Sequence, residues 1–464
     1  MSSVSRRAFL SGTGALALAP FVPSCAIDRT VNRVVEAHLV AAPASIQLAS
    51  SDYPSTAVWA YNGTVPGPAL RVRQGDRLRV HVENRLAEPT TVHWHGIRLA
   101  NAMDGVPYIT QPPIEPGGQF VYDFVVPDAG TYWYHPHQRS FEQSGRGMHG
   151  ALIVDEREPI RVDRDITWIL GDWRLDRDAA IAGGFGSFMD VTHAGRIGNV
   201  VTISGADVDQ FTVRAGERVR LRLINAANAR VFGLEFRGHR PRVVALDGQP
   251  VEPHEPANGT VVLGPAMRAD VVIDMNGEPG SLHDIHDGFY RQRSYRLVEI
   301  AYSREPRFAS IPPDSPIRLG ANPLSEPDIK RAERQEIVFT GGMMGDMRGL
   351  PRGTAWAING KPGSCGTGQP FDPLLWLRKG GSYVLRLVND TAWPHPIHLH
   401  GHAFRLLTHN DRPTRHREWL DTALLLARET AEIAFVADNP GDWMFHCHVL
   451  EHQDAGMMAC LRVV

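Results

Sequence analysis

The stretch TVRAGERVRLRLIN at residues 212–225 occurs three times along this chain in related form. The other copies are RVRQGDRLRVHVEN at 71–84 and WLRKGGSYVLRLVN at 376–389. Each copy predicts a short strand, a turn at a glycine, and a second strand in which apolar and polar residues alternate up to an asparagine. Few other stretches show the apolar period of a helix. The chain is therefore predicted to be all-β, with three sandwich-like domains.

Turn-rich segments separate the three repeats. One lies near Asp155–Pro159, and another is the proline-rich stretch Arg304–Pro327, which we expect to run over the surface as a connector. We predict domains at residues 31–157, 158–305 and 331–464, with a linker at 306–330. The net charge of −3 gives no indication of nucleic-acid binding. No stretch after the N-terminal segment is apolar and long enough to span a bilayer.

The N-terminal segment predicts export. The pair Arg6-Arg7 precedes a short apolar run, which is typical of a twin-arginine (Tat) signal. We expect residues 1–30 to be a signal peptide that directs the protein through the Tat machinery to the periplasm or the cell exterior. The stretch before Cys25 is weakly similar to a lipoprotein cleavage box, so a lipid anchor at Cys25 is the alternative.

The C-terminal segment HCHVLEHQDAGM, residues 446–457, combines several metal-binding side chains. Because successive side chains of a strand point to opposite faces, Cys447 is expected to face away from His446 and His448. Cys447, with His452 and Met457, offers the His, Cys and Met set that a blue-copper electron-transfer site uses. The two flanking histidines offer nitrogens to a second centre directly behind it.

The repeats show which domains carry further ligands. The positions nine and eleven residues after the final asparagine are histidines in the first and third copies, but Leu234 and Phe236 in the second. The segment GTYWYHPH at 130–137 parallels GDWMFHCH at 441–448, with Pro136 in place of Cys447. The first and third domains are therefore interpreted as metal-bearing relatives, and the middle domain as one without ligands.

Four His-x-His pairs result, and each pair is expected on one face of its strand. The pairs are His93 and His95, His135 and His137, His398 and His400, and His446 and His448. They can converge from two domains on one cluster. His395 lies at an odd offset from His398, which places it on the face of Cys447. A zinc site is disfavoured, because zinc prefers four closed ligands and this set exceeds one tetrahedral site.

With these motifs, nearly all of the chain after the signal peptide resembles the multicopper oxidases, the laccase-like family. The resemblance implies three cupredoxin-like (Greek-key β-sandwich) domains and four copper ions. It implies type 1 copper on His395, Cys447, His452 and Met457, and type 2 copper on His93 and His398. It implies a type 3 copper pair on His95, His135, His137, His400, His446 and His448.

The resemblance also implies the reaction. A reductant would give single electrons to type 1 copper, and the trinuclear cluster would reduce dioxygen to water. Phenols and aromatic amines are the expected reductants. Cuprous ion is the alternative, because Met343, Met344 and Met347 offer soft sulfur ligands, unless they only fill a gap near a strand end. A non-catalytic structural relative is disfavoured by the complete ligand set, and we expect a monomer.

Two further positions bear on proton supply. Asp104, in Met103-Asp104-Gly105, matches the acidic residue that the family places beside the cluster, and a simple turn aspartate is the alternative. Gln453 stands where some relatives carry a glutamate proton donor, so Glu451, Asp454 or water would take that role.

Cys365 and Cys460 could form a disulfide or remain two buried thiols.

Overall fold

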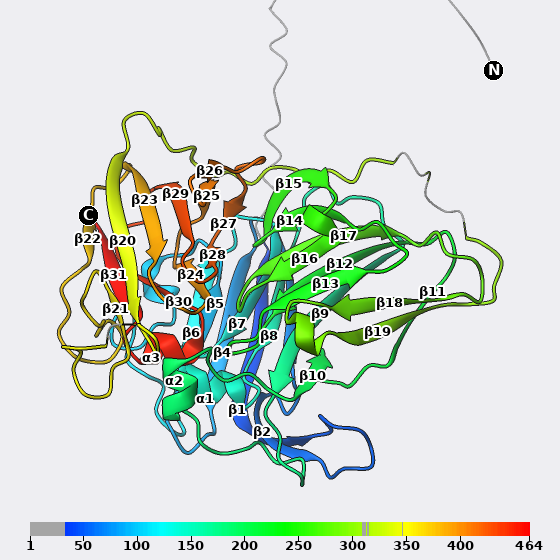
Figure 1. Ribbon diagram of the computed structural model, residues 1–464, viewed down its shortest axis with the longest axis horizontal. Helices are drawn as coiled ribbons and strands as arrows, with labels where there is room; N and C mark the ends of the chain where they lie inside the picture. Colours follow the sequence, from blue (N-terminus) through cyan, green and yellow to red (C-terminus); the bar gives the residue numbers. More distant parts are fainter. Residues whose placement is uncertain (1–32, 309–311, 313–314, 346) are drawn as a thin grey trace, which may run out of the picture. The chain divides into compact units, whose positions relative to one another are not determined.

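The structure is a computed structural model, and it describes residues 33–308, 312, 315–345 and 347–464. The predicted signal peptide, with the Arg6-Arg7 pair and Cys25, lies outside the described residues. The described chain forms six sheets, whose strands are joined by loops and a few short helices (Figure 1). This arrangement confirms the predicted all-β class. Among the described residues, no helix is long and apolar enough to cross a membrane.

The first two sheets contain the strands between residues 34 and 155. One has the order β2-β1-β4-β6, with β1 Val34–Ile46, β2 Thr56–Tyr61, β4 Arg77–Asn84 and β6 Gln119–Val125. The other has the order β3-β8-β7-β5, with β3 Gly67–Arg73, β5 His93–His95, β7 Gly130–His135 and β8 Gly150–Asp155. The short helices η1 Asn101–Met103 and α1 Ser140–Gly145 lie in the connections.

The next two sheets contain the strands between residues 164 and 302. One has the order β10-β9-β12-β17-β14-β15, with β9 Arg164–Trp173, β10 Val200–Ile203, β12 Arg218–Asn225, β14 Arg242–Leu246, β15 Gln249–His254 and β17 Arg268–Asp274. The other has the order β11-β19-β18-β13-β16, with β11 Gln210–Val213, β13 Phe232–Phe236, β16 Thr260–Leu263, β18 Leu282–Asp287 and β19 Tyr295–Tyr302. The helices α2 Phe188–Thr192, η2 Ala257–Gly259 and η3 Arg291–Arg293 belong to this part.

The last two sheets contain the strands between residues 333 and 463. One has the order β21-β20-β23-β29-β25-β26, with β20 Glu333–Gly341, β21 Trp356–Ile358, β23 Ser382–Asn389, β25 Phe404–His409, β26 Arg412–Pro413 and β29 Thr430–Val436; β27 Trp419–Leu420 also pairs with β25. The other has the order β22-β31-β30-β24-β28, with β22 Leu375–Leu377, β24 His395–Leu399, β28 Thr422–Leu425, β30 Gly441–Cys447 and β31 Met458–Val463. Helix α3 Leu450–Asp454 follows β30.

All three parts share one strand arrangement. The alternating strand of each repeat (β4, β12 or β23) pairs in parallel with the first strand of its part (β1, β9 or β20). On its other edge it pairs antiparallel with β6, β17 or β29. The sequence repeat therefore corresponds to a structural repeat of three sandwich domains, which we call domains 1, 2 and 3. The domain boundaries at residues 157, 305 and 331 stay predictions.

The asparagine that ends each repeat holds the following loop in place. The Asn225 side chain donates to the carbonyl oxygens of Arg230 and Leu263 at 2.8 and 2.9 Å, and its oxygen accepts from Ala227 N at 3.0 Å. Asn84 and Asn389 make the corresponding bonds in domains 1 and 3. Because buried backbone groups need partners, this amide fixes the entry into the next strand. In domains 1 and 3 that strand carries a His-x-His pair.

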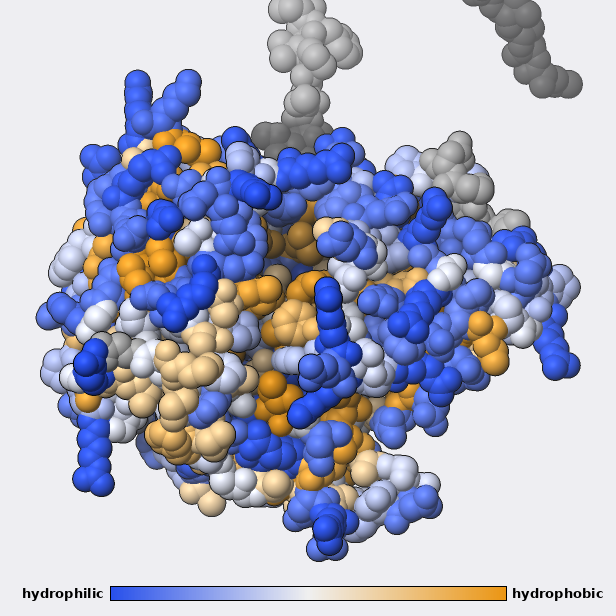
Figure 2. Space-filling model, viewed as in Figure 1, coloured by the Kyte–Doolittle hydropathy of each residue, from blue (hydrophilic) through white to orange (hydrophobic). Residues whose placement is uncertain are grey.

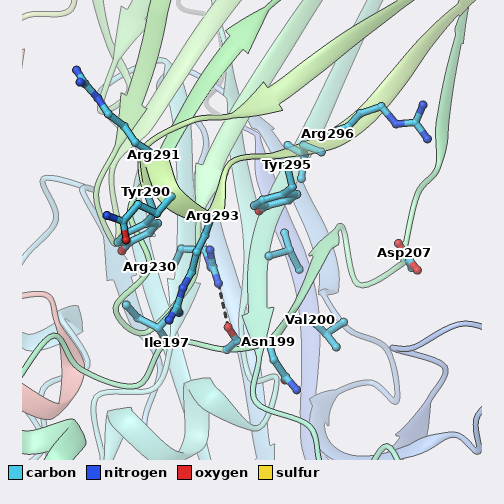
Figure 3. A pocket seen from close by; sticks show the side chains of 14 residues that line it. Ile197, Asn199, Val200, Asp207, Arg230, Tyr290, Arg291, Arg293, Tyr295 and Arg296 are labelled. Carbon is cyan, nitrogen blue, oxygen red and sulfur yellow. Dashed lines mark hydrogen bonds between the residues drawn. The ribbon is translucent and has the colours of Figure 1, made fainter.

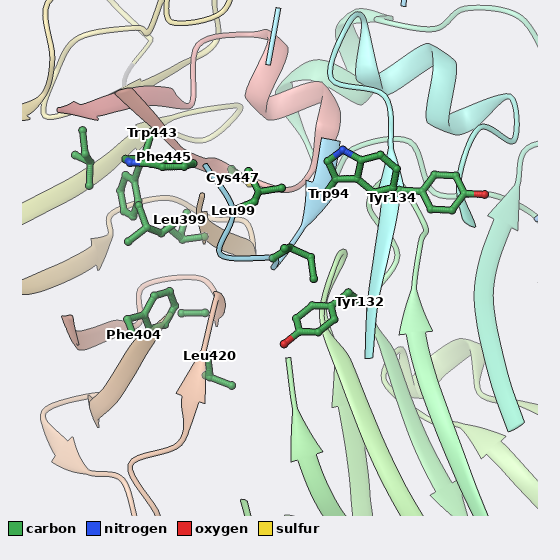
Figure 4. Packing of buried hydrophobic residues seen from close by; sticks show 14 of the residues in the cluster. Trp94, Leu99, Tyr132, Tyr134, Leu399, Phe404, Leu420, Trp443, Phe445 and Cys447 are labelled. Carbon is green, nitrogen blue, oxygen red and sulfur yellow. The ribbon is translucent and has the colours of Figure 1, made fainter. Parts of the chain in front are cut away.

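One apolar core joins domains 1 and 3. It contains Trp94 and Tyr134 from domain 1, and Trp443 and Phe445 from domain 3. Figure 4 shows these rings from both domains on either side of Leu99 and Leu399. Domain 2 has a separate core around Phe232. The surface in Figure 2 is mostly hydrophilic, with apolar patches between charged side chains. The shared core fixes the strands of domains 1 and 3 against each other.

A disulfide joins Cys365 to Cys460, 95 residues apart in sequence, which decides between the two alternatives left by the sequence. Both cysteines are buried, and they contact Val106, Met444 and Met458. Among the described residues, Cys447 is the one free cysteine. The bridge therefore ties the loop before β22 to the final strand, β31.

We predict that Asn225→Ala destabilises the protein by roughly 2–4 kcal/mol, because it removes the partner of one buried carbonyl, one partly buried carbonyl and one buried amide. Asn276→Ala, the same change at an exposed position, should leave stability nearly unchanged. Scanning calorimetry of both variants checks this, and equal melting temperatures would contradict the role given to the repeat asparagine.

Candidate metal centres

Strand β30 presents candidate ligands on both of its faces. It pairs with β24 so that His446 is opposite His398 and Cys447 is opposite Ile397. Because side chains alternate along a strand, His446 and His398 lie on one face of the sheet and the Cys447 thiol lies on the other. All three are fully or almost fully buried. The strand therefore separates two sites by the thickness of one backbone.

Two imidazoles close on the Cys447 thiol. Nδ1 of His395 lies 3.3 Å from Sγ, Nδ1 of His452 lies 3.8 Å from it, and the two Nδ1 atoms are 3.2 Å apart. Met457 is buried next to them, and its carbonyl accepts from the Cys447 amide at 3.0 Å. Two nitrogens and one thiolate can hold one metal ion, and this trigonal set is that of a blue-copper centre. We call these three residues the Cys447 group.

The outer nitrogens of the same imidazoles have protein partners. His395 Nε2 lies 2.8 Å from Thr391 Oγ1, and His452 Nε2 donates to the carbonyl oxygen of His193 at 2.7 Å. The second bond places the His452 proton on Nε2 and leaves a lone pair on Nδ1, facing the thiol. His193 comes from domain 2, and the sequence analysis gave it no role. It acts here through a backbone carbonyl, which has no signature in the sequence.

A second group of candidate ligands lies on the other face of β30. It gathers the four predicted pairs, His93 and His95 from β5, His135 and His137 at the end of β7, His398 and His400 at the end of β24, and His446 and His448 at the end of β30. Ring nitrogens from three residues at a time approach closely enough to share a metal ion in several combinations. All eight are at most 5% exposed. We call this set the eight-histidine cluster.

The hydrogen bonds of the cluster leave lone pairs aimed at its centre. Nδ1 of His93 donates to the Asp104 carbonyl at 2.7 Å, and Nδ1 of His398 donates to the Asp421 carbonyl at 2.8 Å. Their Nε2 atoms are buried and have no hydrogen-bond partner. Nε2 of His400 and Nε2 of His446 face each other at 3.0 Å, while Nδ1 of each is bonded to a protein oxygen. Facing lone pairs are unfavourable unless a cation lies between them, so these residues fit bound metal.

Burial keeps several imidazoles of the two groups neutral. Desolvation, followed by the neighbouring imidazoles, holds the pKa of His135, His137, His400 and His448 well below the usual value for histidine. Burial also lowers the pKa of His452, to about 3. Neutral imidazole is the form that binds metals, so no proton has to leave these rings before an ion binds.

Asp104 contacts cluster histidines from two different domains. Its carboxylate Oδ2 accepts from His400 Nδ1 at 2.8 Å, and its carbonyl accepts from His93. It is 1% exposed. Gly105 follows with φ of +78°, and a side chain at that position would collide with the Val92 carbonyl. The Asp-Gly pair is thus both a tight turn and a contact to two candidate ligands.

Asp421 makes a similar contact that the sequence analysis missed. Oδ1 of its carboxylate lies 3.2 Å from His95 Nε2, and its carbonyl accepts from His398. Burial opposes ionisation of this carboxyl, but the Arg268 guanidinium lowers its pKa to well below the usual range. Asp421 stands in a plain strand pattern, so nothing local in the sequence marks it.

Three multicopper oxidase family models match this chain, at residues 44–159, 164–283 and 348–464. The chain belongs to the multicopper oxidase family. This membership confirms the resemblance predicted from the sequence, the three cupredoxin-like domains and an oxidoreductase activity. The family implies copper as the cofactor, in agreement with the ligand types and lone pairs of the two groups.

Individual relatives are similar over most of their length. The chain is 33% identical to multicopper oxidase MmcO of Mycobacterium tuberculosis, over 93% of this chain and 88% of that protein. It is 29% identical to Laccase-1 of Botryotinia fuckeliana, over 88% of this chain and 79% of that protein. The crystal structure of a multicopper oxidase from Pseudomonas thermotolerans superposes with a TM-score of 0.83, at 38% identity, over 93% of this chain and 99% of that chain.

The acids near Gln453 lie in different surroundings. Glu451 is buried, and its carboxylate accepts from Asn228 Nδ2 at 3.1 Å and from the Arg196 amide at 3.2 Å. Burial raises its pKa to about 7. Asp454 is exposed. Of the two acids considered for the proton route of this multicopper oxidase, Glu451 is therefore the one inside the protein.

A cavity of about 870 Å³ is lined by residues of domain 2 (Figure 3). Its lining includes Ile197, Arg230, Tyr290, Arg293 and Tyr295, and none of the predicted site residues. The Arg230 guanidinium is already bonded to Asp172 and to the Gly198 carbonyl. The candidate metal ligands are thus buried in the interior of the protein and do not line this cavity.

We predict that Cys447→Ser abolishes the blue absorption of the copper-loaded protein and lowers its copper content by about one ion, because the thiolate is lost. His448→Gln, the next residue on the opposite face, should keep the blue absorption and lose copper from the cluster instead. Visible spectra and metal analysis of both variants check this. Loss of the blue absorption in both variants, or in neither, would contradict the separation of the two groups by β30.

Proposed function

We propose that this multicopper oxidase holds four copper ions: type 1 on His395, Cys447, His452 and Met457, type 2 on His93 and His398, and a type 3 pair on His95, His135, His137, His400, His446 and His448. The observation that carries the proposal is the shared strand β30. Its adjacent residues enter both the Cys447 group and the eight-histidine cluster.

When bound, copper would supply the one-electron oxidation of a reductant and the four-electron reduction of dioxygen to water. The chain supplies the link between the two groups. Cys447 is bonded through the backbone to His446 and His448, and His446 Nδ1 also donates to the Cys447 carbonyl at 2.9 Å. Asp104 and Asp421 orient ligand imidazoles by accepting their outer protons. Burial keeps bulk water away from both groups.

For the reductant we propose phenols or aromatic amines. Aromatic side chains pack around the Cys447 group, and of the two named here Trp356 is buried and Trp393 partly exposed. Trp356 packs on His452 at 4.2 Å between ring centroids, and the partly exposed Trp393 packs on His193 at 5.2 Å. His193 in turn accepts the outer proton of His452. An aromatic reductant can stack on the partly exposed Trp393, and relatives named laccase support the same substrate class.

Cuprous ion is a second candidate, favoured by the loop after β20. Met343, Met344 and Met347 line one shallow cavity, and Met344 is 72% exposed. The Met343 carbonyl accepts from the Trp393 indole at 3.1 Å, so this loop contacts the same tryptophan. Thioether sulfur is a soft ligand that suits Cu(I). A relative named copper resistance protein A supports this alternative.

We also propose that the protein is exported through the Tat machinery and acts in the periplasm or outside the cell. The Arg6-Arg7 signal supports export. The Cys365–Cys460 disulfide also supports it, because such bridges persist in oxidising compartments. A monomer suffices, since all twelve proposed ligands come from one chain.

The two reductant classes predict different responses to one variant. In Met343→Leu/Met344→Leu/Met347→Leu the thioethers are lost but the apolar volume is nearly kept. If phenols are the reductant, oxygen uptake with a phenol should be unchanged in this variant. If Cu(I) is bound by the loop, uptake with chelated Cu(I) should fall about tenfold or more while uptake with the phenol persists.

Oxygen-electrode measurements with both reductants, on wild type and variant, check this. Absence of uptake with Cu(I) in the wild type would exclude the second candidate. A copper-loaded protein that is colourless and takes up no oxygen with either reductant would contradict the proposed function and favour a structural role.

A further inference from the structure

Domain 2 contributes none of the proposed ligands, yet it reaches the eight-histidine cluster through one arginine. Arg268 is the first residue of β17 and is fully buried. Nη1 and Nη2 donate to the two carboxylate oxygens of Asp421 in domain 3, at 2.8 and 2.5 Å. Nε donates to the Thr131 carbonyl of domain 1 at 3.2 Å. A single guanidinium therefore joins all three domains next to the cluster.

The Asp421 carboxylate, which Arg268 holds, in turn contacts a candidate ligand. Its Oδ1 lies 3.2 Å from His95 Nε2, and the other ring nitrogen of His95, Nδ1, is buried without a hydrogen-bond partner. The proton of neutral His95 therefore belongs on Nε2, and the lone pair of Nδ1 faces the cluster. The Asp421 carbonyl fixes His398 in the same way through Nδ1. His95 and His398 stack with ring centroids 3.8 Å apart.

Asp247, also of domain 2, holds the backbone at the same place. It is 1% exposed and follows β14. Its Oδ2 accepts from the amides of Asp421 and Thr422, at 3.2 and 3.0 Å, and its Oδ1 accepts from the Arg268 amide at 3.0 Å. Domain 2 thus fixes both the side chain and the main chain of Asp421.

We propose that Arg268 and Asp247 are positioning residues for the trinuclear cluster. They act through Asp421, which sets the tautomer and ring orientation of His95 and His398. The inference rests on the proposed copper function and assigns domain 2 a part in it. A carboxylate held by a bidentate arginine keeps a fixed plane, whereas lysine offers a single point charge and no fork. The planar fork is therefore the feature that the cluster depends on.

Three variants test the proposal. Arg268→Lys keeps the charge and removes the fork. Asp247→Asn keeps the volume but turns an NH₂ group or a single oxygen toward the two amides. Arg220→Lys is the matched control, because Arg220 is equally buried in the same sheet and bonds Asp270 and Glu156 at 2.6 and 2.7 Å. Among the described contacts, Arg220 touches neither Asp421 nor a proposed ligand.

The measurements are the type 2 copper EPR spectrum, the blue absorption, the rate of copper loss to a chelator, and the melting temperature. We expect Arg268→Lys and Asp247→Asn to change the type 2 hyperfine splitting and to weaken retention of cluster copper about 10- to 100-fold. Their blue absorption should stay as in the wild type. Arg220→Lys should lower the melting temperature without changing either copper signal.

Wild-type type 2 spectra and copper retention in both Arg268→Lys and Asp247→Asn would overturn the proposal. If Arg268→Lys fails to fold, Asp247→Asn alone decides it by the same criteria. A wild-type protein that loads copper without any type 2 signal would instead contradict the proposed function.

Discussion

The alternation of side chains along β30 is the constraint on which both centres depend. Cys447 points to one face of the strand, and His446 and His448 point to the other. The two groups must therefore lie back to back, joined by covalent bonds and by one hydrogen bond from His446 to the Cys447 carbonyl. In domain 1 the matching strand β7 ends at His135, and Pro136 follows it in the position of Cys447, so this segment can serve only one of the two groups. The strand with cysteine is the place where they meet.

Such a strand needs a rigid surrounding, because buried neutral imidazoles must be held with their lone pairs converging. The shared apolar core of domains 1 and 3 fixes the four ligand-bearing strands. Hydrogen-bond acceptors outside the cluster then fix the tautomers. Several of these acceptors are backbone carbonyls, such as those of Asp104, His193 and Asp421. Domain 2 supplies the His193 carbonyl to the Cys447 group and Arg268 to Asp421, so a domain without ligands still bears on both groups.

The sequence predicted the features that are local or repeated. The strands, the glycine turns and the terminal asparagines of the three repeats follow from alternation within about fourteen residues. The parity argument brought eight histidines together and put His395 beside Cys447, because it needs only the two-residue period of a strand. The role of Asn84, Asn225 and Asn389 was visible as a repeated position, but its physical reason appeared only with the carbonyls that they bind.

The contacts that orient the ligands were not predictable in this way. Arg268 and Asp421 are 153 residues apart, and Asp247 and the Asp421 amide are 174 residues apart. Neither pair has a spacing rule, and the His193 carbonyl, which accepts from His452, leaves no trace in residue type. The sequence could not decide whether Cys365 and Cys460 form a disulfide for a related reason. Two cysteines can pair only where the backbone brings them together.

The central claim is that one chain holds a single copper at the Cys447 group and three coppers within the eight-histidine cluster, on opposite faces of β30. A copper-edge anomalous difference map of copper-loaded crystals tests it most directly. We expect four peaks, one among His395, Cys447 and His452 and three inside the cluster. A map with copper at only one of the two groups, or with a peak bound by other residues in place of these, would contradict it.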